Sequence, residues 1–257
     1  MGNPIVSTRV LLTNDDGFLA PGLRALRTSA ETRWDVTVVA PDREQSAASH
    51  ALTLNRPLRV TPVDDSTSAV DGTPTDCVML SIMGLLDYRP DIVISGINNG
   101  ANLGDDIIYS GTVAAAAEAT ILGIQAIAFS FTDPVSTDYS WGAEVACIVA
   151  ETVLARGLPK GVFLNVNIPP GTDGRHFDLT RLGTRSYRDV IVEKIDPRGK
   201  PYYWIAGQAD DWWGSDDCDF AAIERNHVSI TPLHLDMTAV ESFGELASWR
   251  FDREREG

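Results

Sequence analysis

Short apolar runs alternate with segments of helical spacing over the first two thirds of the chain. The runs are rich in β-branched residues and predict buried strands at 9–13, 35–40, 91–96, 125–130 and 161–169. The intervening segments predict helices at 19–33, 70–87, 110–123 and 139–157. Strand–helix–strand alternation builds parallel sheets, so we predict an α/β fold with a Rossmann-like, mostly parallel sheet and helices on both faces.

The sequence also predicts where two of the helices begin or end. Thr73 suits an N-cap, Pro74 the first helical position, and Asp76 the third, where its carboxylate can complete a capping box. Gly123 suits the end of the alanine-rich helix. The segment 52–63 is extended but interrupted by a proline, which predicts an edge strand or hairpin.

The pattern changes after about residue 170. The segments "FDLTRLG", "DVIVEKIDPRGKPYYWIAG" and "HVSITPL" alternate apolar with polar residues and contain turn signals, which predicts antiparallel hairpins. No linker intervenes, so we expect one α/β domain over 1–257, with a core at about 9–170 and a hairpin-rich C-terminal extension at about 171–257. The pairs Tyr202–Tyr203 and Trp212–Trp213 are expected to pack a hairpin or a subunit contact. The tail "RFDREREG" is expected to be exposed.

Composition narrows the function classes. The formal charge of -15 argues against a long nucleic acid as partner, because such a partner needs a basic surface. A small anionic ligand stays possible, because a metal or a helix N-terminus can reverse the local field. Three widely spaced cysteines, Cys77, Cys147 and Cys218, form no CxxC pair and are expected to be buried free thiols.

Targeting signals are not recognisable. The first ten residues have no apolar segment typical of a signal peptide, and Val6 stands where a myristoylation signal needs Ser or Thr. No apolar stretch reaches about 18 residues without polar interruption. We therefore expect a cytoplasmic protein that does not enter a membrane.

Polar residues gather after three of the predicted strands. The loops "NDDGFLAPG" (14–22), "PDREQSAASH" (41–50) and "GINNGANLGDDIIYSGT" (96–112) carry more polar groups than a turn requires. In an open parallel sheet, ligands bind beyond the carboxyl ends of the strands. We therefore expect these loops to converge on a binding site.

The adjacent carboxylates of Asp15 and Asp16 have two readings. A turn closed by Asn14 and Gly17 accounts for NDDG as well as a cation site does when the motif is read alone. The spacing does not fit an EF-hand loop. Two carboxylates among neutral oxygen donors suit a hard divalent cation such as Mg²⁺ or Mn²⁺.

The glycine-rich loop does not match known nucleotide motifs. "GINNGANLG" lacks the GxGxxG spacing, and no Walker lysine follows. Ser110, Gly111 and Thr112 directly precede a predicted helix, which makes them either an ordinary N-cap or an anion site. Asp105 and Asp106 are expected to be solvated or structural.

His50 lies in the second loop. Its imidazole could orient a phosphate or move a proton, although a lone loop histidine is commonly a surface residue.

The motifs "LLTNDDGFLAPGL", "VVAPDREQSAASHALTL", "GTPTDCV", "PDIVISGINNGANLGDDIIYSGTVAAAAEA" and "VSITPL" together resemble the stationary-phase survival protein E (SurE-like) family of 5'/3'-nucleotidases. The resemblance runs in order from about residue 9 to 235. It implies a metal-dependent phosphomonoesterase acting on nucleoside 5'- and 3'-monophosphates, with one divalent ion (Mg²⁺ or Mn²⁺) per subunit. It also implies homodimers or homotetramers joined through C-terminal hairpins.

The resemblance places the family's site on particular residues of this chain. The metal ligands it implies are Asp15, Asp16, Ser46 and Asn98. The phosphate contacts it implies are Asn102, Ser110, Gly111 and Thr112. Small departures occur at Ala47, where many members have Gly, and at His50, where the family varies between His and Asn, so that an acid–base role for His50 stays open.

The mechanism expected from these residues is hydrolysis by water activated at the metal. Asp15 and Asp16 are the catalytic candidates, and the sequence does not choose which of them takes the proton from water. Three alternatives remain: a nucleotide-binding regulatory module without turnover, a broader phosphatase acting on short polyphosphate, and a glycosyl- or nucleotidyltransferase.

Overall fold

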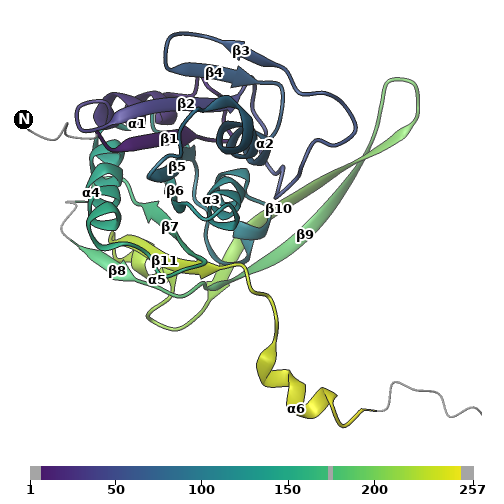
Figure 1. The fold of residues 1–257 in the computed structure, drawn as a ribbon. Coiled ribbons are helices and arrows are strands. Elements are labelled where there is room, and N and C mark those ends of the chain that lie inside the picture. Colours follow the sequence, from purple (N-terminus) through teal and green to yellow (C-terminus); the bar gives the residue numbers. More distant parts are fainter. Residues whose placement is uncertain (1–6, 173–175, 250–257) are drawn as a thin grey trace, which may run out of the picture.

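A mostly parallel sheet runs through the body of the molecule (Figure 1). The computed structural model describes residues 7–172 and 176–249, and within these ranges nine strands form this sheet in the order β3-β4-β2-β1-β5-β6-β7-β11-β8. Its strands are β1 Arg9–Thr13, β2 Asp35–Pro41, β3 Val60–Pro62, β4 Thr67–Val70, β5 Ile92–Asn99, β6 Gln125–Phe131, β7 Val162–Ile168, β8 Phe177–Leu179 and β11 Val228–His234.

The pairing confirms the predicted α/β fold class. Strands β4, β2, β1, β5, β6 and β7 are mutually parallel. Antiparallel pairs occur only towards the two ends of the order within the described residues, where β3 pairs with β4 and β11 with β7. Sheets of this kind carry helices on both faces.

Helices cover both faces of the sheet. The longer ones are α1 Pro21–Ala30, α2 Pro74–Leu80, α3 Gly111–Ile121 and α4 Ser140–Arg156. Helices α1 and α4 contact each other, as do α2 and α3, and each pair packs into its own hydrophobic cluster (Figure 1). Shorter turns are the π-helix Ser81–Leu85, η2 Gly104–Ile108, α5 Asp219–Glu224, η3 Val240–Ser242 and α6 Phe243–Leu246.

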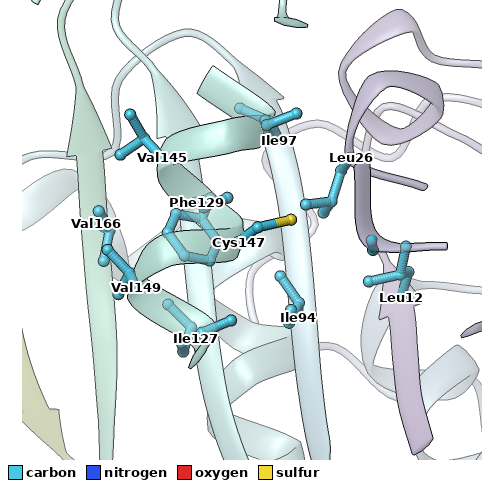
Figure 2. Close-up of a cluster of buried hydrophobic side chains, with 14 of the residues drawn as sticks. Leu12, Leu26, Ile94, Ile97, Ile127, Phe129, Val145, Cys147, Val149 and Val166 are labelled. Carbon is cyan, nitrogen blue, oxygen red and sulfur yellow. The ribbon is translucent and has the colours of Figure 1, made fainter. Parts of the chain in front are cut away.

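Figure 2 shows the larger of the two clusters. Val145, Cys147 and Val149 of α4 lie against Ile127 and Phe129 of β6. These side chains are almost completely buried. Burial on this scale, at about 25 cal/mol per Å² of apolar surface, fixes the strands whose ends carry the polar loops.

The predicted helix signals operate as expected. Thr73 caps α2 and forms a capping box with Asp76, and Pro74 occupies the first helical position. Ser110 caps α3 by accepting a hydrogen bond from the N–H of Val113. Gly123 follows the helix with φ of 78°, the left-handed conformation that glycine adopts without strain.

The C-terminal third differs in part from the prediction. The strands β9 Thr184–Ile195 and β10 Pro201–Trp213 form the expected antiparallel hairpin, which runs out from the body (Figure 1). "FDLTRLG" and "HVSITPL" do not form hairpins; they supply β8 and β11, which pair parallel to each other in the main sheet. An alternating pattern suits a half-buried strand near a sheet edge as well as a hairpin, so it could not distinguish the two.

Four further expectations concern the edge segment, the cysteines, membrane-spanning helices and the chain ends. The edge segment 52–63 forms a strand only at Val60–Pro62. All three cysteines are buried free thiols, as predicted. Within the described residues, no helix has the length and apolar character to cross a bilayer. The start of the chain (1–6) and the tail "RFDREREG" lie outside the described residues.

Candidate functional site

The candidate site lies at the point in the sheet where the order of the strands reverses direction. The chain passes from β1 to β2 on one side and later returns to place β5 on the other side of β1. Asp15 and Asp16 follow β1, and Asn98 and Asn99 end β5. In open α/β sheets the crevice beyond the strand ends at this switch point is where ligands bind.

Asp15 is held against the start of α3. Its side chain is 5% exposed, and Oδ1 accepts a hydrogen bond from the hydroxyl of Thr112. Burial raises the pKa of Asp15, while hydrogen bonds from Thr112 and from nearby backbone groups act in the opposite direction. A Cβ atom added at Gly111 would lie 2.9 Å from Cβ of Asp15, so only glycine leaves room for this carboxylate.

Asp16 bridges the crevice between β1 and β5. Its Oδ2 accepts a hydrogen bond of 3.0 Å from the N–H of Asn99. Burial, followed by the charge of Asp15, raises the pKa of Asp16 to about 6, and the charge of Glu44 adds to the shift. The side chain of Asn99 is bound separately, because the hydroxyl of Tyr139 donates a hydrogen bond of 2.9 Å to its Oδ1.

The second loop is tied to both of its neighbours. The N–H of Gln45 donates to the carbonyl of Asp15 at 2.7 Å, and the hydroxyl of Ser49 donates to the carbonyl of Ile108 at 2.7 Å. Ser46, next to Gln45, is exposed and donates its hydroxyl proton to Glu44 at 2.7 Å. The three polar loops therefore converge, as predicted.

Two asparagines of the glycine-rich loop have different surroundings. Asn98 donates its amide N–H to the carbonyl of Gly100 at 2.8 Å, which directs its amide oxygen away from that contact. Asn102 is buried and donates its side-chain amide to Ser130 at 2.7 Å. Two side chains of β7 bind the backbone of Asn102. The N–H of Asn102 donates to Asn167, and its carbonyl accepts from Asn165 and Asn167.

His50 does not contact the acidic pair. Its Nε2 lies 2.8 Å from a carboxylate oxygen of Glu118, a buried residue in the middle of α3. Both His50 and Ser49 line a cavity of about 840 Å³ that is otherwise mainly apolar and extends from α3 to β11. That cavity is distinct from the switch point, and its apolar lining suits packing rather than phosphate.

The second acidic pair does not follow a strand of the sheet. Asp105 is exposed and Asp106 half-buried, both in the first turn of η2.

The acidic pair suits a cation. Neither Asp15, which is buried, nor Asp16, which is half-buried, forms an ion pair with any residue in the described ranges. The amide oxygen Oδ1 of Asn14, the residue before the pair, is also buried and has no hydrogen-bond partner among the described residues. Within the same ranges no cluster of three or more His, Cys, Asp or Glu side chains is placed to hold a metal, so the fit is to a hard cation that takes two carboxylates and neutral oxygens.

Some residues that shape the site were not singled out from the sequence. Asn165 and Asn167 lie in an otherwise apolar strand, and Tyr139 precedes a helix 40 residues after its partner Asn99. Glu118 did carry a signal, because it is the single charge in an alanine-rich helix. The others became visible only through contacts between distant segments.

The fold and the site together define a doubly wound α/β protein with paired carboxylates at the switch point of its sheet, one of which, Asp15, contacts the first turn of a helix. Residues 10–189 match the family model described as "Survival protein SurE". The "5'-nucleotidase SurE" of Pelobacter propionicus is 53% identical over 245 residues, covering 94% of this chain and 99% of that protein. The protein of the same name from Geotalea daltonii is 52% identical over 244 residues, covering 94% and 98%.

A solved structure agrees with these sequences. The crystal structure of the SurE protein from Aquifex aeolicus matches with a TM-score of 0.83 and 42% identity, covering 93% of this chain and 98% of that one. The chain belongs to the SurE family.

Proposed function

We propose that this protein is a metal-dependent phosphomonoesterase that hydrolyses nucleoside 5'- and 3'-monophosphates to nucleoside and phosphate. The observation that carries the proposal is the pair Asp15 and Asp16 at the switch point, where neither carboxylate has an ion-pair partner in the described ranges and Asp15 contacts the start of α3. Membership of a family whose relatives carry the name 5'-nucleotidase supports the same reading.

The residues that would hold one divalent ion, Mg²⁺ or Mn²⁺, are Asp15, Asp16, Ser46 and Asn98. Their donor set is two carboxylates, a hydroxyl and an amide oxygen, which is the chemistry that hard cations take. When bound, the ion polarises the phosphate and lowers the pKa of a coordinated water.

The protein's own groups then orient and neutralise the reacting phosphate. The N-terminus of α3, with Ser110, Gly111 and Thr112, presents backbone N–H groups and the positive end of the helix dipole to phosphoryl oxygens. Asn102 lies in the loop that leads to this helix and is held by hydrogen bonds to Asn167 of β7 and to Ser130. Thr112 orients Asp15, and the N–H of Asn99 orients Asp16.

Chemically, water adds to phosphorus, the ester P–O bond breaks, and the proton from water passes to the leaving oxygen. Asp15 or Asp16 takes part in that proton movement. Nε2 of His50 is paired with Glu118 at 2.8 Å, so a contact of this residue with phosphate would use its other ring nitrogen.

We also propose a cytoplasmic homodimer or homotetramer joined through the β9–β10 hairpins. The hairpin runs out from the body (Figure 1), and Ile191, Tyr203 and Trp204 expose more than half of their surface. Apolar side chains exposed together on a projecting arm favour burial against another copy. The mass in solution, measured by light scattering for the protein and for a Tyr203→Ser/Trp204→Ser variant, tests this; an unchanged mass would contradict it.

The activity is tested by phosphate release from a panel of nucleoside 5'- and 3'-monophosphates, with Mg²⁺, with Mn²⁺ and after chelation. We expect release that needs the cation and that falls about a hundredfold or more in Asp15→Asn. Asp105→Asn is the matched control, because Asp105 is an exposed carboxylate of the other acidic pair.

The same panel, extended with a short polyphosphate and an alcohol acceptor, separates the alternatives. Release that persists after chelation would contradict the metal requirement. Nucleotide binding without any release would favour the regulatory module, and transfer of phosphate or sugar to an alcohol acceptor would favour a transferase.

A further inference from the structure

Asp219, the first residue of α5, is a buried carboxylate far from the switch-point carboxylates in sequence. Its side chain is 0% exposed. Oδ2 accepts a hydrogen bond of 2.7 Å from the N–H of Gly104, and Oδ1 accepts from the N–H groups of Gly183 at 2.8 Å and Phe220 at 2.9 Å. A buried carboxylate satisfied by backbone N–H groups alone is a connector between the segments that supply them.

Asp219 connects two segments. One is the loop from Asn102 to Ser110, called here the phosphate loop, and the other is the base of the β9–β10 hairpin. Gly104 comes two residues after Asn102 and begins the turn that leads to Ser110. Gly183 directly precedes β9. Asp219 therefore joins the loop proposed to bind phosphate to the root of the arm proposed to bind another subunit.

The backbones approach closely at this junction. A Cβ added at Gly104 would lie 2.6 Å from the carbonyl oxygen of Gly183, and Gly104 has φ of 53°. Both features require glycine there. The N–H of Asp219 donates to the carbonyl of Arg181 at 2.9 Å, which fixes the carboxylate relative to the same hairpin root.

A small apolar cluster makes the same connection independently. Leu103, between Asn102 and Gly104, packs in a cluster with Cys218 and Phe220. Trp212, near the end of β10, stacks on Phe220 with ring centroids 5.5 Å apart and an interplanar angle of 8°. Displacement of the hairpin root would therefore move Leu103 and the loop that carries it.

The phosphate loop is thus clamped from two sides. Asn165 and Asn167 of β7 hold the backbone of Asn102, and Asp219 holds Gly104. Burial raises the pKa of Asp219, and the backbone N–H groups oppose that shift.

We propose that Asp219 is a positioning residue that sets the phosphate loop for its substrate and couples that loop to the hairpin arm. This inference rests on the proposed function, because it assigns to Asp219 a part in binding the phosphate of a nucleotide. Asp219 acts through Gly104 and Leu103 and has no assigned contact with the reacting atoms.

The test uses Asp219→Asn in the full-length protein. The substitution keeps the shape of the side chain but replaces one acceptor oxygen by an amide donor, so that it leaves either the N–H of Gly104 or the N–H groups of Gly183 and Phe220 without an acceptor. Asp217→Asn is the matched control, because Asp217 is an exposed carboxylate two residues away, bound to Ser215 and Arg181.

We expect KM for the nucleotide and the inhibition constant of inorganic phosphate to rise together by about tenfold in Asp219→Asn, because a displaced loop weakens every phosphate contact. The dissociation constant of Mn²⁺ is expected to stay within about twofold of the wild-type value, since Asp15, Asp16 and Ser46 lie on other segments and Asn98 belongs to strand β5, before the part of the loop that Asp219 holds. Asp217→Asn is expected to keep all three wild-type values.

Two results would overturn the inference. One is an Asp219→Asn protein with wild-type KM and wild-type inhibition by phosphate. The other is an equal loss of Mn²⁺ and phosphate affinity, which would indicate general damage to the fold.

A second variant decides the matter if Asp219→Asn does not fold. Trp212→Leu removes the stacking on Phe220 from the hairpin side and is expected to raise the same two constants, with unchanged values counting against the coupling. If wild-type protein released no phosphate from any nucleotide, the proposed function would fail, and the affinity for inorganic phosphate, measured by calorimetry, would still decide the role of Asp219.

Discussion

The hydroxyl of Thr112 donates a hydrogen bond to Oδ1 of Asp15, and this contact joins the carboxyl end of β1 to the first turn of α3. The two residues are 97 positions apart in sequence. The contact places a buried carboxylate at the positive end of a helix dipole, which stabilises its charge. The same geometry brings the proposed cation ligands and the proposed phosphate-binding helix end within reach of one substrate group.

Removing the hydroxyl should cost activity with little loss of fold. Thr112→Val keeps the shape of the side chain but cannot donate to Asp15, so we expect activity to fall about 10–100-fold, as is usual when an orienting partner of a metal ligand is lost. Thr112→Ser retains the hydroxyl and should recover most of the rate. Steady-state kinetics at saturating Mn²⁺ check this, and equal rates in Val and Ser variants would contradict the orienting role.

The glycine beside Asp15 should tolerate no side chain. In Gly111→Ala the new Cβ would lie 2.9 Å from Cβ and 3.0 Å from Oδ2 of Asp15, which forces the carboxylate to move. Overpacking of this kind costs about 1–3 kcal/mol of stability, and here it should also lower kcat. Gly84→Ala is the control, because no atom lies within 4 Å of its added Cβ. Thermal unfolding and kinetics measured on both variants give the comparison, and a fully active Gly111→Ala enzyme would be inconsistent with the packing.

The acidic pair should destabilise the metal-free protein. Burial and the charge of Asp15 oppose ionisation of Asp16, so the neutral isostere in Asp16→Asn should raise the stability of the metal-free protein by about 1 kcal/mol, or about 2–4 °C in Tm. Mn²⁺ should raise the Tm of the wild type through binding to the native state, and should do so much less in the variant. Calorimetry with and without Mn²⁺ tests both statements. An identical Mn²⁺ shift in the two proteins would contradict the assignment of Asp16.

A pH-dependent contribution to stability is expected at the edge strand β8. The hydrogen bond from Arg225 lowers the pKa of Asp178, and the hydrogen bond from His227 lowers it by a smaller amount. Because the folded-state pKa is the lower one, ionised Asp178 stabilises the fold above its unfolded pKa of about 4, and this contribution is lost as the pH falls through the folded value.

The matching variant is Asp178→Asn. It should be less stable than the wild type by about 1 kcal/mol near neutral pH, and the difference should shrink below about pH 4. Urea unfolding at several pH values measures it; a difference that grows on acidification would reverse the sign of the argument.

Much of the fold could be predicted because its signals are local. The capping box of Thr73 and Asp76 and the buried strand before Asp15 depend on neighbours within a few positions. The placement of β8 and β11 in the main sheet could not be predicted, because the pairing of Phe177–Leu179 with a strand about 50 residues later depends on register and burial that a half-polar pattern does not encode.

The residues of the candidate site likewise fall into those that the sequence indicates and those that it does not. Asp15, Asp16 and Ser110 lie at strand and helix ends, where polar residues exceed the needs of a turn. The sequence did not indicate Asn165 or Asp219, because the side chain of each forms hydrogen bonds with the backbone of a loop distant in sequence. A side chain that binds backbone groups leaves no partner motif in the sequence.

The central claim is that Asp15 and Asp16 hold one divalent cation per subunit. The most direct measurement is Mn²⁺ binding to the purified protein, followed by the electron paramagnetic resonance of free Mn²⁺, for the wild type, the Asp15→Asn/Asp16→Asn variant and the Asp105→Asn control. The account predicts one bound ion per subunit in the wild type and the control, and none at the same concentrations in the double variant. Retention of wild-type stoichiometry and affinity by the double variant would contradict it.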